Sequence, residues 1–563
     1  MSKNLLLLLL LFVCNISLGQ FTSNSALNEV IQDQAGSEQA TPLISSRDDG
    51  GAYISWFDQS SGSYVLRMQR LDAAGNKLWG PQGIMVSNAP QSTALFRYDL
   101  KTDQLGNAVV AFQDERTGSL QIVVQKLDSN GIAFWQTNGI VLLDAVGTEG
   151  LSPSLGILGN NRIIIAWNAY SANAKWVSFY DLDPITGAPI NGGTSPEKII
   201  SGIAGTNYSR PKILGIGLNQ YYLLYVQEVG NFPGASSKIY AKKMESGNIS
   251  LWPNQILVST KTITFFYFPN FISDGNTGFT IAFNTSNPTS AALTSVYVQH
   301  VDSSGLLWSP TGTAATSSTS IQSYLGDYFH HNLNNETWIA IQATNTGQSA
   351  SGNSFQRVDA NGILLLGANG VVVDPQVTSI TTPVGFAQNG TNGTIIYFDG
   401  SFGQQVIKAT NINSAGTKQW TISSTSICSN LSNKDDIGIT KFINDQIIVA
   451  WSDTRIDNGV YAQNLNMDGT IGPLAVGINS IEKTESNFLF QNPSSDLIIR
   501  SNLGKSQNNL LRIYSFAGSI LIQEEIIYND QSFLIETNNL ADGIYLVQYG
   551  NQIEKWIKCA TYK

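Results

Sequence analysis

The chain has 563 residues, of which 42% are hydrophobic and only 13% are charged, and its formal net charge is −10 at pH 7. Proteins bind nucleic acid and anionic membranes through basic patches, so this acidic balance argues against both as partners. Beyond the N-terminus, no apolar run reaches the roughly 18 residues of a transmembrane helix, and we expect no transmembrane segment. The sequence contains no CxxC or HExxH motif, so we expect no metal site and no cofactor from these patterns.

Residues 1–19 have the features of a signal peptide. Lys3 precedes the apolar run from Leu5 to Val13, and small residues follow at Ser17 and Gly19. The apolar run is too short to span a bilayer, so we expect cleavage before Gln20 and export of the remainder.

One pattern repeats eight times within residues 42–478, with a period of about 56 residues. In the first copy an apolar run closes at Trp56, and a second run ends in Gln69-Arg70-Leu71-Asp72. A turn containing Gly75 follows, and then Trp79. The large residue that closes the first run returns as Phe112, Trp167, Tyr225, Phe283, Ile341, Tyr397 and Trp451. A fixed period of this length indicates a repeat architecture.

Each copy predicts four short strands, and no copy shows sustained helical periodicity. In the first copy we expect strands at 42–46, 52–57 and 64–71, and a fourth that starts at 77–79, with 84–86 as its possible continuation. Four short strands repeated radially indicate an all-β fold, a β-propeller of about eight four-stranded blades. A β-solenoid is the competing interpretation, but its coils are usually shorter than this unit. The sequence leaves ring closure open, and the apolar stretch 27–31 within segment 20–41 is a candidate ring-closing strand.

The repeat resembles the sialidase-like and BNR-repeat propellers of secreted bacterial proteins. The resemblance rests on a turn that ends in tryptophan, seen as Asp72-x-x-Gly75-x-x-x-Trp79 and again from Asp128 to Trp135. The family's Asp-box has one residue between Asp and Gly, whereas this chain has two. The resemblance therefore implies a fold and no chemistry, and tryptophan at a fixed repeat position indicates packing between blades.

The C-terminal part differs from the repeat. Residues 479–487 read as a linker, and residues 488–563 alternate as short strands with Gly turns, which is typical of a small β-sandwich. This segment resembles the C-terminal sorting domain of type IX secretion cargo in the Bacteroidetes. The resemblance implies a partner, the type IX secretion machinery, and a protein that is secreted or attached to the outer cell surface. The residues that carry it are Asn492, Pro493, Gly518, Gly543, Tyr545, Lys555 and Lys558.

Two sets of residues are candidate ligand sites. The loops between the second and third strands are longest in the fourth to sixth copies. Scaffold loops tolerate insertions, so this length is either neutral drift or, because the three loops are neighbours on one face, a binding rim. The residues in or beside them that suit stacking or hydrogen bonding are Phe232, Asn284, Asn287, Asn345 and Asn353. The alternative is an acidic rim two positions after the second-strand aromatic, which would suit Ca²⁺ or sugar hydroxyls unless each carboxylate only caps its own turn. Its members are Asp58, Asp114, Asp399 and Asp453.

No set of residues in the sequence forms a recognisable catalytic group. We therefore expect non-catalytic binding or adhesion, with a glycan or a protein as the ligand. Two alternatives stay open: a propeller-type glycoside hydrolase or lyase, and a structural surface protein without a discrete ligand. A catalytic carboxylate pair would need a convergence of side chains that a sequence does not show.

Overall fold

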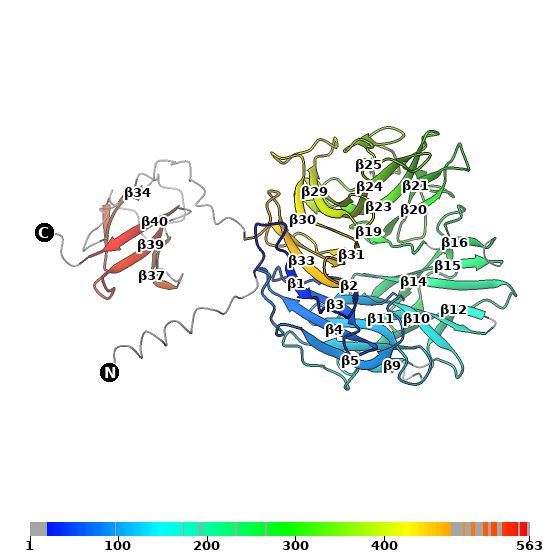
Figure 1. Cartoon of the computed structure of the whole chain (residues 1–563). Helices are drawn as coiled ribbons and strands as arrows, with labels where there is room; N and C mark the ends of the chain where they lie inside the picture. The colour runs from blue at the N-terminus through cyan, green and yellow to red at the C-terminus, as the bar shows by residue number, and fades with distance from the viewer. Residues whose placement is uncertain are drawn as a thin grey trace. The chain divides into compact units, whose positions relative to one another are not determined.

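The structure is a computed structural model that describes two stretches of the chain. The first is residues 20–473 apart from 96, 143, 173, 191–192, 194, 231–233 and 265–266. The second comprises residues 488–489, 497–501, 510–515, 519–525, 532–549 and 552–559. Every regular element in these stretches is a β-strand, so the fold is all-β as predicted. The chain divides into two compact units, Met1–Leu474 and Ala475–Lys563, which are described separately (Figure 1).

The first unit contains eight antiparallel sheets of a β-propeller. Sheets 1 to 7 each consist of strands that follow one another along the chain. Sheet 1 comprises β2 (Gln39–Ser46), β3 (Ala52–Asp58), β4 (Tyr64–Leu71) and β5 (Ile84–Gln91). Sheet 2 comprises β6 (Asp99–Thr102), β7 (Ala108–Asp114), β8 (Gln121–Leu127) and β9 (Ile140–Leu142). Sheet 3 comprises β10 (Glu149–Ile157), β11 (Ile163–Ser171), β12 (Ala174–Leu182) and β13 (Glu197–Ile199). Sheet 4 comprises β14 (Thr206–Ile216), β15 (Gln220–Val229), β16 (Ser236–Glu245) and β17 (Ile249–Ser250), and β18 (Ile256–Leu257) also pairs with β16.

The second half of the ring repeats this order, and only the last sheet departs from it. Sheet 5 comprises β19 (Ile272–Ser273), β20 (Phe279–Ser286), β21 (Thr294–Val301) and β22 (Thr313–Ala314). Sheet 6 comprises β23 (Ile321–His331), β24 (Glu336–Asn345), β25 (Ser351–Val358) and β26 (Val371–Val372). Sheet 7 comprises β27 (Thr381–Asn389), β28 (Asn392–Asp399), β29 (Gln405–Ile412) and β30 (Thr425–Ser432). Sheet 8 comprises β31 (Lys434–Ile439), β32 (Gln446–Asp453), β33 (Gly459–Asn466) and β1 (Glu29–Gln32).

The N-terminal strand therefore completes the last sheet. β1 pairs antiparallel with β33, with Glu29 opposite Ala462 and Val30 opposite Tyr461. A shared apolar core joins this sheet to sheet 1, and it includes Phe21, Ile31, Trp56, Ile448 and Val460. Because the two ends of the repeat region meet in one sheet, the N-terminal segment holds the first and last repeats together.

The first strands of the sheets lie next to one another at the centre of the unit. Asp99 of β6 accepts the backbone N–H of Leu155 in β10 at 2.9 Å. Asp327 of β23 accepts that of Phe386 in β27 at 2.8 Å. Figure 1 shows the sheets from blue to orange arranged around this common centre. The first strands therefore surround the propeller axis.

The fourth strand of sheet 1 begins later than the sequence predicted. Lys77 forms only a single bridge to Leu71, and the strand proper starts at Ile84. The side-chain amide of Gln69 explains the difference: it donates to the carbonyl of Gly80 at 2.6 Å and accepts the N–H of Trp79 at 3.0 Å. This side chain takes the place of a ladder bond and bends the chain before the strand can form.

Five tryptophans each link the end of one sheet to a turn of the next sheet. Trp79 Nε1 donates to the carbonyl of Ser129 in the following turn at 3.1 Å. A Cβ at Gly131 would lie 3.2 Å from the Trp79 ring, and its φ of +81° is unfavourable for other residues. The same bond recurs from Trp135 to Ile185, Trp252 to Ser303, Trp308 to Ala360 and Trp420 to Met467. Gly and Trp therefore repeat together because one packs on the other.

The second unit contains two sheets around one core. Its sheets are β34 (Phe488–Leu489), β35 (Leu497–Ser501) and β38 (Ser532–Ile535), and β37 (Ile520–Glu525), β36 (Leu510–Ser515), β39 (Gly543–Tyr549) and β40 (Gln552–Lys558). Leu497 and Ile535 from the first sheet share a core with Ile513, Val547 and Trp556 from the second, which makes a β-sandwich.

Several of the predicted sorting-motif residues form hydrogen bonds to the backbone of this sandwich. The Tyr545 hydroxyl donates to the carbonyl of Ala541 at 2.7 Å, and Lys558 Nζ donates to two backbone carbonyls. Gly543 begins β39 and Lys555 lies in β40. Three of the predicted motif residues lie outside the described residues: Asn492, Pro493 and Gly518.

Candidate functional site

Three adjoining pockets open on one face of the propeller. We call it the loop face, because it carries the loops between second and third strands and the connections between sheets. The pockets are lined by residues near the beginning of first strands, the end of second strands or the beginning of third strands, and by residues of the connections between sheets. In an antiparallel sheet these positions share one edge. The sequence also placed a ligand site on this face, but at the long loops of the fourth to sixth copies, of whose described residues only Glu228 lines one of these pockets.

The central one, the axial pocket, has a volume of about 420 Å³. Asp436 comes from sheet 8, Thr41 from sheet 1, Asp99 from sheet 2 and Lys212 from sheet 4. Residues of sheets 8 and 4 can share one pocket only at the axis, since these sheets are separated around the ring. The complete lining is Thr41, Pro42, Leu43, Leu95, Arg97, Tyr98, Asp99, Lys212, Asp436, Ile437 and Gly438.

Two cations in the axial pocket have no direct hydrogen-bond or ion-pair partner among the described residues. Within the described part of the chain, neither the Arg97 nor the Lys212 side chain forms a hydrogen bond or an ion pair. Arg97 instead lies over the ring of Phe268, with its Cζ 4.3 Å from the ring centroid. The surrounding protein lowers the pKa of Lys212 because it disfavours the charged amine, an effect that Asp99 partly opposes. The hydrogen-bond donors of both side chains are therefore available to an anionic ligand.

The same pocket contains a carboxyl group whose pKa is raised, whereas that of Lys212 is lowered. Burial, reinforced by the neighbouring carboxylate of Asp435, raises the pKa of Asp436 from 3.8 to about 6, and Arg97 opposes this shift. An amine with a lowered pKa and a carboxyl with a raised pKa are the pair that general acid–base chemistry requires near neutral pH. Such perturbed groups are typical of functional sites.

Backbone irregularities place these side chains. The first strands β2, β14 and β31 each contain a register shift, and the residue at the shift has a positive φ: 51° at Thr41, 55° at Arg210 and 46° at Asp436. A bulge of this kind redirects the following side chains, here toward the axis. A positive φ is costly for residues other than glycine and is concentrated at functional sites.

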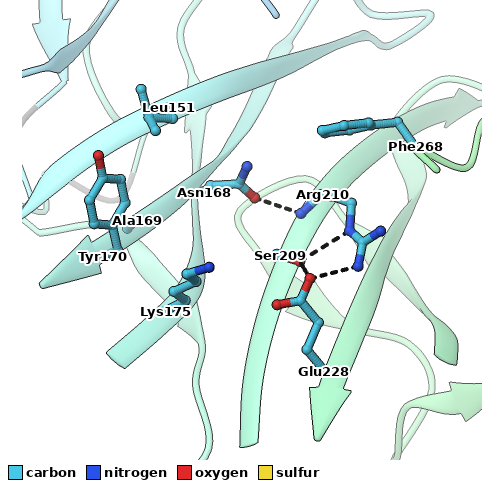
Figure 2. A pocket seen from close by; sticks show the side chains of 9 residues that line it. All are labelled: Leu151, Asn168, Ala169, Tyr170, Lys175, Ser209, Arg210, Glu228 and Phe268. Carbon is cyan, nitrogen blue, oxygen red and sulfur yellow. Dashed lines mark hydrogen bonds and ion pairs between the residues drawn. The ribbon is translucent and has the colours of Figure 1, made fainter. Parts of the chain in front are cut away.

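The second pocket, the apolar pocket, lies between sheets 3 and 4 and has a volume of about 370 Å³ (Figure 2). Leu151, Ala169 and Phe268 form apolar walls. At its base the buried guanidinium of Arg210 pairs with Glu228 at 2.6 Å, and the Arg210 N–H donates to Asn168 at 2.5 Å. Figure 2 shows these bonds on one side of the pocket, opposite Tyr170 and Lys175. Because Phe268 also lies against Arg97, the apolar pocket borders the axial pocket.

The third pocket, the polar pocket, has a volume of about 500 Å³ and shares Thr41, Leu95 and Asp436 with the axial pocket. Its other lining residues come from sheets 8 and 1 and from the connection into sheet 2. They are Glu38, Ala40, Gln59, Tyr64, Ser92, Thr93, Ala94, Asn433, Asp435, Ser452, Thr454 and Asn458.

The asparagines proposed for the long loops hold those loops together. Asn287 is buried and accepts the N–H groups of Thr289 and Ser290. Asn345 accepts those of Ser349 and Ala350 in the same way. Asn284 accepts the N–H of Leu325, and the buried Asn353 donates to Asp374. Phe232 lies outside the described residues. Ligand binding by this set stays a prediction, and these four side chains already have internal partners.

The residues of the acidic rim are each paired with a cation. Asp58 and Asp453 are fully buried and lie 2.6 Å from Arg67 and Arg455, respectively. Asp58 and Asp453 also accept the N–H two residues on, which is the turn-capping geometry. Asp114 and Asp399 pair likewise with Arg116 at 2.5 Å and Lys408 at 2.6 Å. No group of three or more His, Cys, Asp or Glu side chains suited to a metal ion occurs in the described part of the chain.

Sequence reasoning missed the residues of the axial pocket. Arg97, Lys212 and Asp436 belong to three different repeats and match no local motif. One signal was present: the dipeptides Thr41-Pro42 and Arg210-Pro211, in which a residue at positive φ precedes a proline on an edge strand. Aligning the repeats and marking each residue that precedes a proline would have indicated the bulges.

Comparisons with known proteins identify the tail. Residues 489–560 match the family model described as the secretion system C-terminal sorting domain. The protein therefore carries a type IX sorting domain and is secreted or located at the outer cell surface. No helix able to cross a membrane occurs among the described residues.

The rest of the chain has only distant likenesses. None of the curated proteins matches the sequence. Among solved structures, an ulvan lyase of polysaccharide lyase family PL25 is 11% identical, with a TM-score of 0.43 and coverage of 80% of this chain and 97% of that chain. The polysaccharide lyase Uly1 is 8% identical, with a TM-score of 0.37 and coverage of 78% and 92%. The α-L-arabinofuranosidase Arb93A from Fusarium graminearum is 10% identical, with a TM-score of 0.31 and coverage of 79% and 99%. At these scores the likenesses carry no argument about function.

Proposed function

We propose that this exported propeller is a polysaccharide lyase that cleaves an acidic polysaccharide in the axial pocket. The observation that carries the proposal is that Arg97 and Lys212, two cations without a direct hydrogen-bond or ion-pair partner in the part of the chain that the structure describes, line one pocket with Asp436. The chain as a whole is acidic, but the local charge at the axis decides which sugar the pocket accepts. The non-catalytic binding expected from the sequence is the alternative that the experiment below separates.

Each of the three side chains has a place in a β-elimination. Arg97 binds the carboxylate of a uronate residue, which acidifies the proton on the adjacent carbon. Lys212, in its neutral form, removes that proton, and the electron pair forms a carbon–carbon double bond as the glycosidic bond breaks. Asp436, in its acid form, donates a proton to the departing oxygen. The products are an unsaturated sugar and a free hydroxyl, so atoms and charge balance without a co-reactant.

The pocket fits hydrolysis less well. Glycoside hydrolases need two carboxyl groups beside the scissile bond. Asp99, the other carboxylate with Asp436 in this pocket, accepts the N–H of Leu155 at 2.9 Å and has Lys101 at 3.5 Å. The Asp99 carboxylate is therefore already used in the hydrogen bond that joins sheets 2 and 3.

The test uses the mature protein and a panel of uronate polysaccharides, with the ultraviolet absorbance of the unsaturated product as the readout. Lys212→Met should lower kcat by about a hundredfold or more, the usual contribution of a general base. Arg97→Met should raise KM and also lower kcat, because Arg97 both binds the carboxylate and acidifies the proton that is removed. Lys441→Met, an exposed lysine at the opposite end of β31, is the matched control and should have no effect.

The pH profile adds a second readout. Turnover needs Lys212 neutral and Asp436 protonated, so the rate should fall on the acid side as Lys212 charges and on the alkaline side above about pH 6 as Asp436 ionises. Wild-type turnover by Lys212→Met would refute the reaction. Binding of an acidic polysaccharide without any cleavage would also refute it and would restore the binding role.

A further inference from the structure

The polar pocket continues the axial pocket toward sheets 8 and 1. The two pockets share the walls formed by Thr41, Leu95 and Asp436. A sugar residue in the axial pocket would therefore have its neighbour along the chain in the polar pocket. A volume of about 500 Å³ is within the range of small-molecule sites and accommodates a sugar residue.

The charges of the two pockets differ. No lysine or arginine lines the polar pocket, whereas Glu38, Asp435 and Asp436 do. The Glu38 carboxylate is held in place by the hydroxyl of Tyr64 and by Asn458 Nδ2, the latter at 2.9 Å. Burial, followed by the hydrogen bond to Glu38 and its charge, raises the pKa of Tyr64 to about 12.

The other lining groups suit an uncharged sugar. Ser92, Thr93 and Thr454 carry hydroxyls, and Asn433 carries an amide. Such groups exchange hydrogen bonds with sugar hydroxyls, and the Glu38 and Asp435 carboxylates can accept from them. A uronate in the same position would instead face like charges, which disfavours binding.

We propose that the substrate is a polysaccharide in which an acidic sugar is followed by an uncharged one, and that the polar pocket selects the uncharged residue. This inference rests on the proposed binding of an acidic sugar in the axial pocket. It excludes chains in which every residue is acidic, because their second residue would meet Glu38 and Asp435.

The experiment compares binding of two kinds of polymer to the mature protein by calorimetry. Hyaluronan and gellan separate their uronates with uncharged sugars, whereas polygalacturonate and alginate carry a carboxylate on every residue. We expect at least one of the separated polymers to bind about tenfold more tightly, per site, than either homopolymer, a factor that corresponds to about 1.4 kcal/mol.

The double variant Glu38→Gln/Asp435→Asn removes the two charges and keeps side-chain shape. It should tighten polygalacturonate binding about fivefold to tenfold and thereby reduce the difference in affinity between the two kinds of polymer. Glu197→Gln, an exposed carboxylate on β13 away from the pockets, is the control and should change neither affinity. Thermal midpoints of all variants check that the fold is unchanged.

The outcomes separate this inference from the proposed function. Equal or tighter binding of the homopolymers, with no gain in the double variant, would overturn the selection of an uncharged neighbour and leave the axial site intact. Failure of all four polymers to bind would overturn the proposed function and this inference with it.

Discussion

Removal of the Phe21 side chain should loosen the junction between sheets 8 and 1. Phe21 is 2% exposed and lies directly on Gly75, where a Cβ would be 2.8 Å from its ring. Its N–H donates to the carbonyl of Ala74 at 3.0 Å. Phe21 thus takes the place that a tryptophan of the preceding sheet takes at five of the other turns.

The size of the effect follows from this burial. Replacing a buried Phe by Ala costs about 3–5 kcal/mol, from lost transfer free energy and the cavity left behind. The segment before β1 can relax into part of that cavity, so we expect the lower figure of about 3 kcal/mol. In a local opening equilibrium this corresponds to roughly a hundredfold.

Hydrogen exchange of the amides in β1 and β33 measures this opening directly. Phe21→Ala should speed their exchange by roughly a hundredfold, while amides of sheets 3 to 6 keep their rates. Leu27→Ala, in the same segment but 61% exposed, is the control and should change little. Exchange of β1 at the wild-type rate in Phe21→Ala would refute the view that this side chain holds the first and last repeats together.

Three further predictions address packing, pH and export. Trp135→Ala should lower the free energy of unfolding in urea by about 3–5 kcal/mol, and Trp135→Phe, which keeps an aromatic ring but loses the bond to Ile185 and part of the indole volume, by about 2 kcal/mol; unchanged stability of Trp135→Phe would contradict a role for the indole N–H. Burial raises the pKa of Asp327 from 3.8 to about 6, so its contribution to stability is full below about pH 4 and is lost as pH rises through about 6. Asp327→Asn, neutral throughout, should therefore gain stability relative to the wild type between about pH 4 and pH 7, and a constant difference in urea midpoint would argue against the shift. Truncation after residue 487 should abolish export and leave the circular dichroism of the propeller unchanged, because the sorting domain is a separate compact unit; normal export of the truncated chain would contradict the sorting role.

Much of the fold was predictable because its signals are local or periodic. The alternation of Val65 to Leu71 defines a strand, and the Gly and Trp of each turn repeat because one packs on the other. The order of tail motifs was enough to predict the sorting domain. The predicted start of the fourth strand was wrong because the Gln69 side chain forms a hydrogen bond with the backbone of Gly80, just before the strand. Strand propensity does not include such a contact.

The candidate site was beyond the reach of the sequence. Asp58 and Asp453 stand out in the repeat, yet the fold buries both and pairs them with arginines. Arg97, Lys212 and Asp436 carry no motif and lie more than a hundred residues apart in the chain. They share a pocket because successive sheets turn around one axis. Lys212 and Asp436 lie at bulges of their first strands, and Arg97 lies in the connection that leads into β6. The periodicity of the sequence determined the strands of each sheet. Only the arrangement of the sheets around the axis brought the charged side chains of the axial pocket together, because these residues come from different repeats.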